Sequence, residues 1–449
     1  MPVWATVTVC DALHVMQSEG AAQTGVPPED VSPGRPLPST RSLAEGARMR
    51  VGAVGTTSLV VVSVLVSVAI AELAVRSMNL EPPPMWEFNR TVGWRYQPGL
   101  RTWYRTSEFT SWVEINATGL HDREHAYTKA ADVFRVLLLG DSFTAAIEVP
   151  FENSFARILE KRLNELAAPK RVEVINAGVG GFSTVNELLM FREEGTKYKP
   201  DLVLLFLVDP DIRDNFHLTA ENVVPGAPYF ALIDGHLVLR HFPTGALTSV
   251  KRYVGRLRIV RLAYRIFASL GPRLAAGEKQ HSDLSAPHAL SMASLYAERR
   301  RPEWEQAIEI TRTLVRELDR EVGATGGRLA VVSFGSTVSG EVQGRSGTGR
   351  GGPERELQEF FASLRIPSHW LGHCLDNEDR IHGRPVRFSH DRHFNTHGHE
   401  LVAADLEAFL RDHDLLPGVV AHETAEAAHS RASVPGLTSP CRASSDSTS

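Results

Sequence analysis

The sequence predicts an α/β fold, in which helices flank a doubly wound and mostly parallel sheet. Three observations predict it. Apolar runs expected to be strands alternate with helix-like stretches along residues 134–412. The run 136–139 is apolar at every position, as in strands that are buried on both faces. A Gly-Asp pair follows this run directly and ends the strand.

The expected elements follow the chain in the alternating order that a parallel sheet requires. We expect strands at 134–140, 172–177, 201–208 and 328–334, a weaker strand near 368–374, and helices near 151–167, 184–194, 303–322, 354–363 and 398–412. The segment 211–300 interrupts the order. Its Asp234-Gly235 pair predicts a β-hairpin. Its basic helical stretch, 250–267, suits a lid over a site or an anionic lipid surface, although a solvated face is the commonest role.

An uncharged run near the N-terminus predicts a membrane anchor. Residues 51–71 carry no charge, and a helix of this length crosses a bilayer. A cleaved signal peptide and a buried core helix are the alternatives. Arginines precede the run at 41, 48 and 50, whereas only Arg76 follows it closely. This bias predicts a single-pass protein whose C-terminal part lies outside the cytoplasm.

Composition sets the remaining boundaries and excludes some partners. We expect a disordered segment at 1–48, the anchor at 49–78, a juxtamembrane spacer and cap at 79–133, the α/β domain at 134–415 with its insert at about 211–300, and a disordered tail at 416–449. The net charge is only −5, and no basic patch with interleaved aromatics is present, so nucleic acid is not expected as a partner. Two of the three cysteines lie in the tails, which argues against a disulfide framework.

Four blocks of polar and glycine residues carry the chemistry. The Gly-Asp-Ser run 140–142 lies where a strand turns toward a helix, a place where backbone N–H groups can face a developing negative charge. The glycine-rich run 176–181 permits close approach of the backbone. The run 208–215 follows a further strand. In the fourth block Asp391 precedes His393 by two residues, so its carboxylate can orient an imidazole that serves a serine. Each block alone is also explained by a structural turn or a solvated loop.

Together, the blocks resemble those of the SGNH, or GDSL-type, hydrolase superfamily in identity, order and approximate position. The resemblance covers about residues 134–412 and rests on the Gly-Asp-Ser, Asn-Ala-Gly-x-Gly-Gly and Asp-x-His motifs. The N-terminal anchor, the Gly-Trp-Arg run 93–95 and the Asn-x-x-Gly-Leu run 116–120 are similar to a membrane-tethered branch. The resemblance implies a flavodoxin-like SGNH fold. It also implies a membrane-anchored serine esterase or deacylase that hydrolyses or transfers an acyl group, acetyl being one candidate, without a cofactor.

The resemblance also implies roles for single residues. Ser142 would be the nucleophile and His393 the general base. Asp391 would orient the imidazole. The backbone N–H groups of Ser142 and Gly181 would belong to the oxyanion hole.

The third block departs from the family's pattern. The family usually places an Asn there, whose side chain completes the oxyanion hole. Alignment of this block puts Pro210 at that position, and proline has no donor. Asn215 is the candidate replacement. Without a replacement, the chain would be a weak enzyme or a binding module that keeps the SGNH fold.

A metal-dependent hydrolase is the other alternative. A short run contains the candidate ligands His390, Asp391, His393, His397 and His399. His393 and His397 have the i, i+4 spacing that binds zinc on a helix, but the run starts on an expected loop. The resemblance to SGNH hydrolases, in contrast, implies an acyl-ester substrate, such as an O-acylated glycan or a lipid, and attachment to the membrane.

Overall fold

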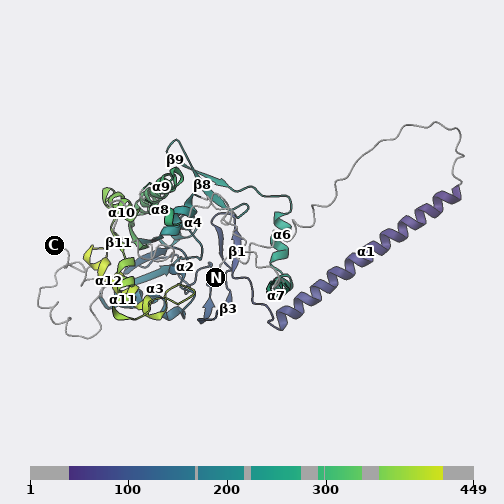
Figure 1. The fold of residues 1–449 in the computed structure, drawn as a ribbon, viewed down its shortest axis with the longest axis horizontal. Helices are drawn as coiled ribbons and strands as arrows, with labels where there is room; N and C mark the ends of the chain where they lie inside the picture. Colours follow the sequence, from purple (N-terminus) through teal and green to yellow (C-terminus); the bar gives the residue numbers. More distant parts are fainter. Residues whose placement is uncertain are drawn as a thin grey trace, which may run out of the picture. The chain divides into compact units, whose positions relative to one another are not determined.

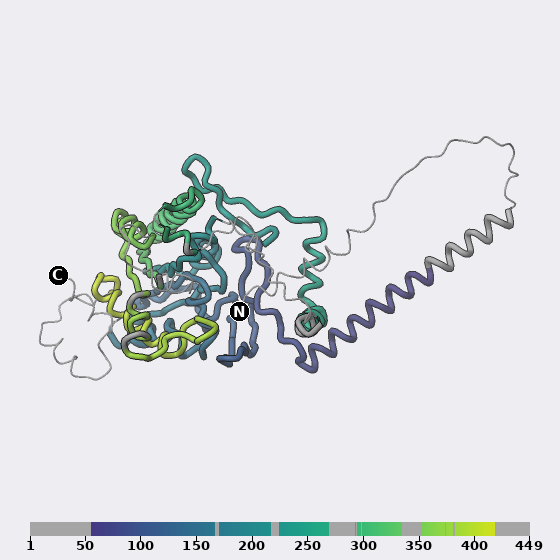
Figure 2. Tube along the Cα trace, in the orientation of Figure 1, coloured from purple at the N-terminus to yellow at the C-terminus, as the bar shows by residue number. Residues whose placement is uncertain are grey.

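The structure, a computed structural model, describes residues 40–166, 170–216, 224–274, 292–297, 299–335 and 353–417. These residues belong to two compact units (Figures 1 and 2). The first unit comprises the described residues of 85–245 and 282–449, and the second those of 4–84 and 246–281. The predicted disorder of 1–39 and 418–449 lies outside the described residues.

The first unit is built on a five-stranded parallel sheet. The strands are β5 (Val133–Leu139), β6 (Arg171–Asn176), β7 (Leu202–Val208), β10 (Arg328–Gly335) and β11 (Ser368–Trp370). Their order across the sheet is β11-β10-β7-β5-β6. Every residue of β7 is buried, as its continuous apolar run predicts. The predicted strands are confirmed, and the weak last one is shorter than expected.

Helices cover both faces of this sheet. The helices of the first unit are α2 (Ser142–Ala145), α3 (Phe155–Leu166), α4 (Thr184–Glu193), α5 (Asp209–Asn215), α8 (Met292–Leu295), α9 (Pro302–Ala324), α10 (Pro353–Ser363), α11 (Gly372–His382) and α12 (Thr396–Asp412), with short 3₁₀ turns at Phe151–Asn153 and Gly195–Tyr198. Leu137 of β5 packs in one core cluster with α4, α9 and α10. Its neighbour Leu138 packs in the other with α3, α11 and α12. Alternate side chains therefore point to opposite faces, and the doubly wound prediction is confirmed. Cys374 in α11 is disulfide-bonded.

Two antiparallel strand pairs precede the sheet in the chain. They are β1 (Trp86–Asn89) with β2 (Gly93–Tyr96), and β3 (Arg101–Arg105) with β4 (Thr110–Glu114). The buried side chains of Tyr96 and Val113 belong to the same core cluster as Leu137. The strands predicted as a cap are thus an integral part of the α/β unit.

The predicted insert is divided between the two units. Its first part is the expected hairpin, β8 (Pro228–Ile233) and β9 (His236–His241). Asp234 and Gly235 join these strands with φ of 50° and 77°, the positive values of a type I′ turn. The second part holds α6 (Thr248–Gly255) and α7 (Arg258–Leu274) and belongs to the second unit.

The second unit also contains the long N-terminal helix α1 (Thr40–Ser77). This helix starts at Thr40, before the predicted anchor, and the expected boundary of disorder at residue 48 stays a prediction. Within it, Gly55–Ser77 is long and apolar enough to cross a membrane, and only 11% of its most apolar stretch is buried. A signal sequence passes the same test of length and composition.

Candidate active site

Ser142 is presented by a tight turn at the carboxyl end of β5. The strand ends at Leu139, and Ser142 is the first residue of α2. The Asp141 carboxylate caps this short helix by accepting the Phe143 N–H at 2.9 Å. At Gly140 a Cβ atom would lie 2.1 Å from the Thr144 hydroxyl oxygen, so only glycine fits. The Gly-Asp-Ser sequence is therefore what this turn requires.

One hydrogen bond connects Ser142 with the loop before α12, and a second joins two residues of that loop. The His393 Nε2 lies 2.8 Å from the Ser142 Oγ. The opposite ring nitrogen, Nδ1, lies 2.5 Å from Oδ1 of Asp391. Because Ser142 and His393 are 251 residues apart in the sequence, the fold alone brings these groups together. The arrangement is that of a hydroxyl, an imidazole and a carboxylate in series.

The loop that carries His393 is fixed at both ends. Glu108, in the turn between β3 and β4, accepts the N–H groups of His390 and Asp391, the latter at 2.7 Å. At the other end, the Asn395 side chain caps α12 by accepting the Gly398 N–H at 3.0 Å. Between these points the Phe143 ring packs on the His393 ring, with centroids 4.8 Å apart. The cap strands therefore help to hold the imidazole in place.

Glu148 is a site residue that sequence reasoning missed. Its carboxylate is buried, and its Oε1 lies 3.5 Å from Nδ1 of His393, beside Asp391. Glu148, Asp391 and His393 each have one atom of a type that can ligate a metal ion, and these three atoms lie within 4.8 Å of one another. Burial favours the neutral imidazole, but the charges of Glu148 and Asp391 outweigh burial and raise the pKa of His393 to about 9.

The raised pKa predicts the pH dependence of any reaction in which His393 is the base. Only the neutral imidazole accepts a proton, so kcat/KM should rise with pH until about pH 9. Glu148→Gln removes a negative charge that favours the imidazolium. The rising limb of the pH profile should therefore move to lower pH by about 1 to 3 units. A pH series of initial rates measures this shift.

Glu152→Gln is the matched control for this experiment. Glu152 lies four residues from Glu148, and its side chain is 72% exposed, so the same loss of charge occurs in solvent. The control profile should coincide with that of the wild type. If the rising limb of the pH profile does not move in Glu148→Gln, Glu148 does not raise the pKa of His393.

The second predicted block forms a turn after β6 that lies against Ser142. The Phe182 N–H donates to the Val179 carbonyl at 3.1 Å and closes the turn. Gly181 occupies its third position with φ of 79°, as a type II turn requires. A Cβ atom on Gly180 would lie 3.8 Å from Cβ of Ser142. Within the part of the chain that the structure describes, the N–H groups of Ser142 and Gly181 donate to no protein acceptor.

The structure does not bring Asn215 to this turn as a donor. Asn215 is fully buried at the end of α5. Its Oδ1 accepts the Val185 N–H at 3.1 Å, and its Nδ2 donates to the Thr311 hydroxyl at 3.0 Å. Among the described residues, its amide forms no hydrogen bond with Ser142 or Gly181. Asn215 therefore ties α5 to α4 and α9, and its expected substitution for the missing donor finds no support.

The histidine-rich run does not converge on one point. His397 lies 3.3 Å from Glu378, and His390 lies 3.3 Å from Glu108. His399 is buried, and its Nδ1 accepts the Phe155 N–H at 3.3 Å. Together with His393, these side chains have separate partners, so the alternative of a zinc site made by this run is not supported.

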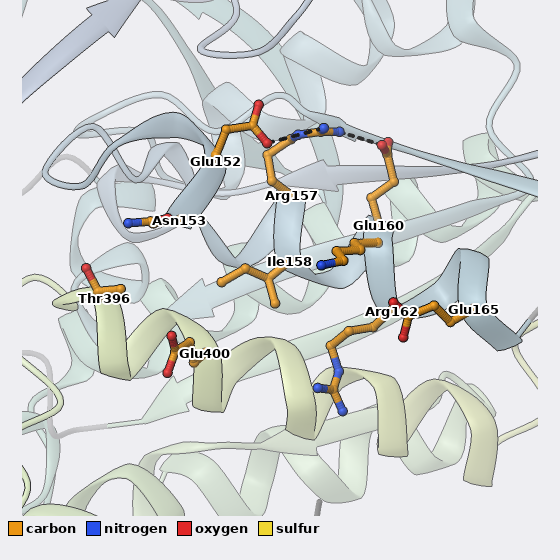
Figure 3. Close-up of a pocket in the computed structure, with 10 residues that line it drawn as sticks. Glu152, Asn153, Arg157, Ile158, Glu160, Arg162, Glu165, Thr396 and Glu400 are labelled. Carbon is orange, nitrogen blue, oxygen red and sulfur yellow. Dashed lines mark hydrogen bonds and ion pairs between the residues drawn. The ribbon is translucent and has the colours of Figure 1, made fainter. Parts of the chain in front are cut away.

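A surface hollow of about 620 Å³ lies between α3 and the start of α12 (Figure 3). Charged side chains dominate its lining. Arg157 forms ion pairs with Glu152 and Glu160 at its edge. The lining contains neither Ser142 nor His393. The hollow is therefore separate from the residues that could carry out acyl transfer.

The chain is similar to several solved structures and to one protein family. Solved structures that resemble the chain include a putative G-D-S-L family lipolytic protein from Desulfitobacterium hafniense DCB-2, with 11% identity over 62% of this chain and 99% of that one and a TM-score of 0.33. A lipase/acylhydrolase from Enterococcus faecalis has 16% identity over 63% and 97%, with a TM-score of 0.32. The acetyl xylan esterase AlAXEase has 12% identity over 61% and 98%, with a TM-score of 0.32. No curated protein matches the chain. Residues 136–406, more than half of the chain, match the family described as GDSL-like Lipase/Acylhydrolase, and the protein belongs to that family of ester hydrolases.

Proposed function

We propose that the protein is a serine esterase in which Ser142, His393 and Asp391 form the catalytic triad. The observation that carries the proposal is the 2.8 Å contact between the His393 Nε2 and the Ser142 Oγ. A base must lie within hydrogen-bond reach of the proton that it removes, and this one does. Asp391 on the other nitrogen fixes the tautomer and stabilises the imidazolium.

The reaction follows from these positions. The Ser142 Oγ attacks the acyl carbonyl carbon while its proton passes to Nε2 of His393. The ester's C–O bond then breaks, and the alcohol leaves with that proton. Water, or the hydroxyl of an acceptor, next loses a proton to Nε2 and attacks the acyl-serine, and the proton returns to Ser142 as the acid or the new ester leaves. The proposed substrate class is thus an acyl ester, with acetyl esters, O-acylated glycans and lipids as candidates.

Two backbone donors would stabilise the oxyanion formed in each step. Among the described residues, the N–H groups of Ser142 and Gly181 have no protein acceptor, and the Gly180-Gly181 turn lies against the serine. Donors that are already oriented stabilise the developing charge without reorganisation. Pro210 supplies no third donor at the position where the family usually has an Asn.

A fluorophosphonate probe tests this function directly. The full chain should be labelled covalently at Ser142 and should hydrolyse chromogenic esters, whereas Ser142→Ala should do neither. A chain that neither reacts nor turns over would instead be a binding module. Equal labelling of the Ser142→Ala variant would contradict the assignment of the nucleophile.

We also propose that α1 anchors the enzyme in a membrane. In addition to the apolar span Gly55–Ser77, the helix α7 supports this proposal. Glu72, near the end of the span, accepts the N–H groups of Arg258 and Ile259 at 3.0 and 2.8 Å and so caps α7. Beyond this cap, Phe267 is 73% exposed beside arginines of the same helix. A basic helix with exposed apolar side chains, attached to the end of a spanning helix, is suited to the membrane interface.

The excess of arginine before the span predicts that the catalytic unit lies outside the cytoplasm. A reporter that works only outside the cytoplasm should be active when it is fused after residue 415. The full chain should also stay with membranes at alkaline pH, where peripheral proteins are released. Activity from a reporter that works only in the cytoplasm would contradict this topology.

A further inference from the structure

Residues of the cap hold the turn that contains Gly181. The indole Nε1–H of Trp94 donates to the Gly180 carbonyl at 3.0 Å. The Tyr96 hydroxyl oxygen accepts the Gly180 N–H at 3.0 Å. Both aromatic residues lie on β2, more than 80 residues before the turn. The two polar groups of Gly180 are thus fixed by neighbouring side chains of one strand.

The bond from Trp94 acts on the peptide unit that carries the Gly181 N–H. The Gly180 carbonyl and the Gly181 N–H belong to the same planar peptide group, and in the trans form they point in opposite directions. Fixing the carbonyl toward Trp94 therefore fixes the direction of the Gly181 N–H on the other side. A hydrogen bond to the carbonyl also polarises the peptide group, which makes its N–H a stronger donor.

Packing restricts the same peptide. The Trp94 ring meets the Phe182 ring edge to face, with centroids 5.8 Å apart. Tyr96 is fully buried and lies 5.7 Å from Trp86 by ring centroids. A Cβ atom on Gly180 would lie 3.3 Å from the Tyr96 hydroxyl oxygen and 3.8 Å from Cβ of Ser142. The glycine is thus enclosed between the cap and the serine, with little room to rotate.

From this geometry we propose that Trp94 and Tyr96 are positioning residues of the oxyanion hole. They touch no reacting atom, and they act by orienting the Gly181 N–H toward the developing negative charge. The inference rests on the proposed function, because it assumes that Gly181 is an oxyanion donor. It gives the cap strands a catalytic purpose beyond packing. Stabilisation of the oxyanion should depend more strongly on the orientation of the Gly181 N–H in this protein, because Pro210 supplies no side-chain donor.

Trp94→Phe is the main test, since phenylalanine keeps an aromatic ring against Phe182 and removes the indole N–H. Loss of an oxyanion donor costs roughly 10²–10³ in rate, and a donor that is present but less well oriented should cost less. We expect kcat on a chromogenic ester to fall about 10-fold, with KM within about twofold, because the oxyanion forms mainly in the transition state. Tyr96→Phe, which leaves the Gly180 N–H without its acceptor, should have a similar effect.

Trp112→Phe is the matched control. Trp112 lies on the exposed face of β4, and its indole N–H donates to Glu114 at 2.7 Å. This variant loses an equivalent bond away from the turn and should keep the wild-type kcat. Rates are normalised to active enzyme by titration with a fluorophosphonate, and thermal melting shows whether each variant is folded.

Three further readouts separate positioning from a merely structural role. The rate constant of fluorophosphonate labelling should fall with kcat in Trp94→Phe, because the phosphoryl oxygen occupies the same hole. The pH at which the rate rises should not move, since His393 is untouched. A folded Trp94→Phe variant with unchanged kcat, or with only a lower melting temperature, would overturn the inference while leaving the triad in place. A wild type that is neither labelled nor active would overturn both.

Discussion

Ser142→Ala and His393→Ala should each lower kcat/KM for a chromogenic ester by about 10⁴-fold or more. The first change removes the attacking oxygen, and the second removes the base that lies 2.8 Å from it. The double variant should be little worse than either single variant, because the members of a triad act as one unit. Initial rates of the purified full chain measure this result. Ser363→Ala, a change at a serine exposed on α10, is the control and should keep full activity.

Asp391→Asn should be milder than either of these changes. Glu148 faces the same imidazole nitrogen at 3.5 Å and can still stabilise the imidazolium when Asp391 is gone. The double variant with Glu148→Gln should therefore lose far more activity than the sum of the two single effects predicts. Full activity in Ser142→Ala would rule out this mechanism. Additive losses at Asp391 and Glu148 would show that the two carboxylates do not replace each other.

The sequence predicted those features that have a local cause. A continuous apolar run such as β7 is buried on both faces and is recognisable without its neighbours. The Asp234-Gly235 turn was predictable because few residue pairs adopt two positive φ values in succession. The Gly-Asp-Ser turn and the Asp-x-His loop were also predicted because their geometry has a local cause. Their motifs describe short-range geometry that the chain encodes within a few residues.

Features that depend on tertiary contacts were not predictable. Glu148 follows Ser142 by six residues, yet nothing in its surroundings shows that its carboxylate will face His393. Asn215 seemed available as a donor, but α4 and α9 already occupy its amide through Val185 and Thr311. The hydrogen bond from Trp94 to Gly180 spans 86 residues. A sequence pattern of short period carries no information about such pairs.

The site nevertheless follows from the fold, because β6 and β7 flank β5 in a parallel sheet. The carboxyl ends of neighbouring parallel strands meet at one edge, which is where ligands bind in open α/β sheets. The segment after β5 presents Ser142, and the segment after β6 presents Gly181. The segment after β7 begins with Asp209 and Pro210. The proposed alignment, which puts Pro210 in place of the family's third donor, therefore puts that position next to the serine's own strand.

Pro210→Asn should restore that donor and raise kcat. Pro210 is the second residue of α5, where the backbone N–H has no intrahelical acceptor, so asparagine can replace proline without leaving a helix bond unmade. Loss of one oxyanion donor costs roughly 10²–10³ in rate, so its recovery should raise kcat by up to about 10²-fold. KM should change little, because the new bond forms mainly in the transition state. Rates on a chromogenic acetyl ester measure both constants.

Two further variants make this result specific. Pro210→Ala removes the proline ring without adding a side-chain donor, and it should leave kcat near that of the wild type. Asn215→Ala should lower the melting temperature, because it removes the buried amide that binds Val185 and Thr311, without lowering kcat of the folded enzyme. A loss of kcat in Asn215→Ala as large as the gain expected for Pro210→Asn would show that Asn215 is the third oxyanion donor. Unchanged rates in both Pro210→Asn and Asn215→Ala would show that the third block aligns differently from the placement at Pro210.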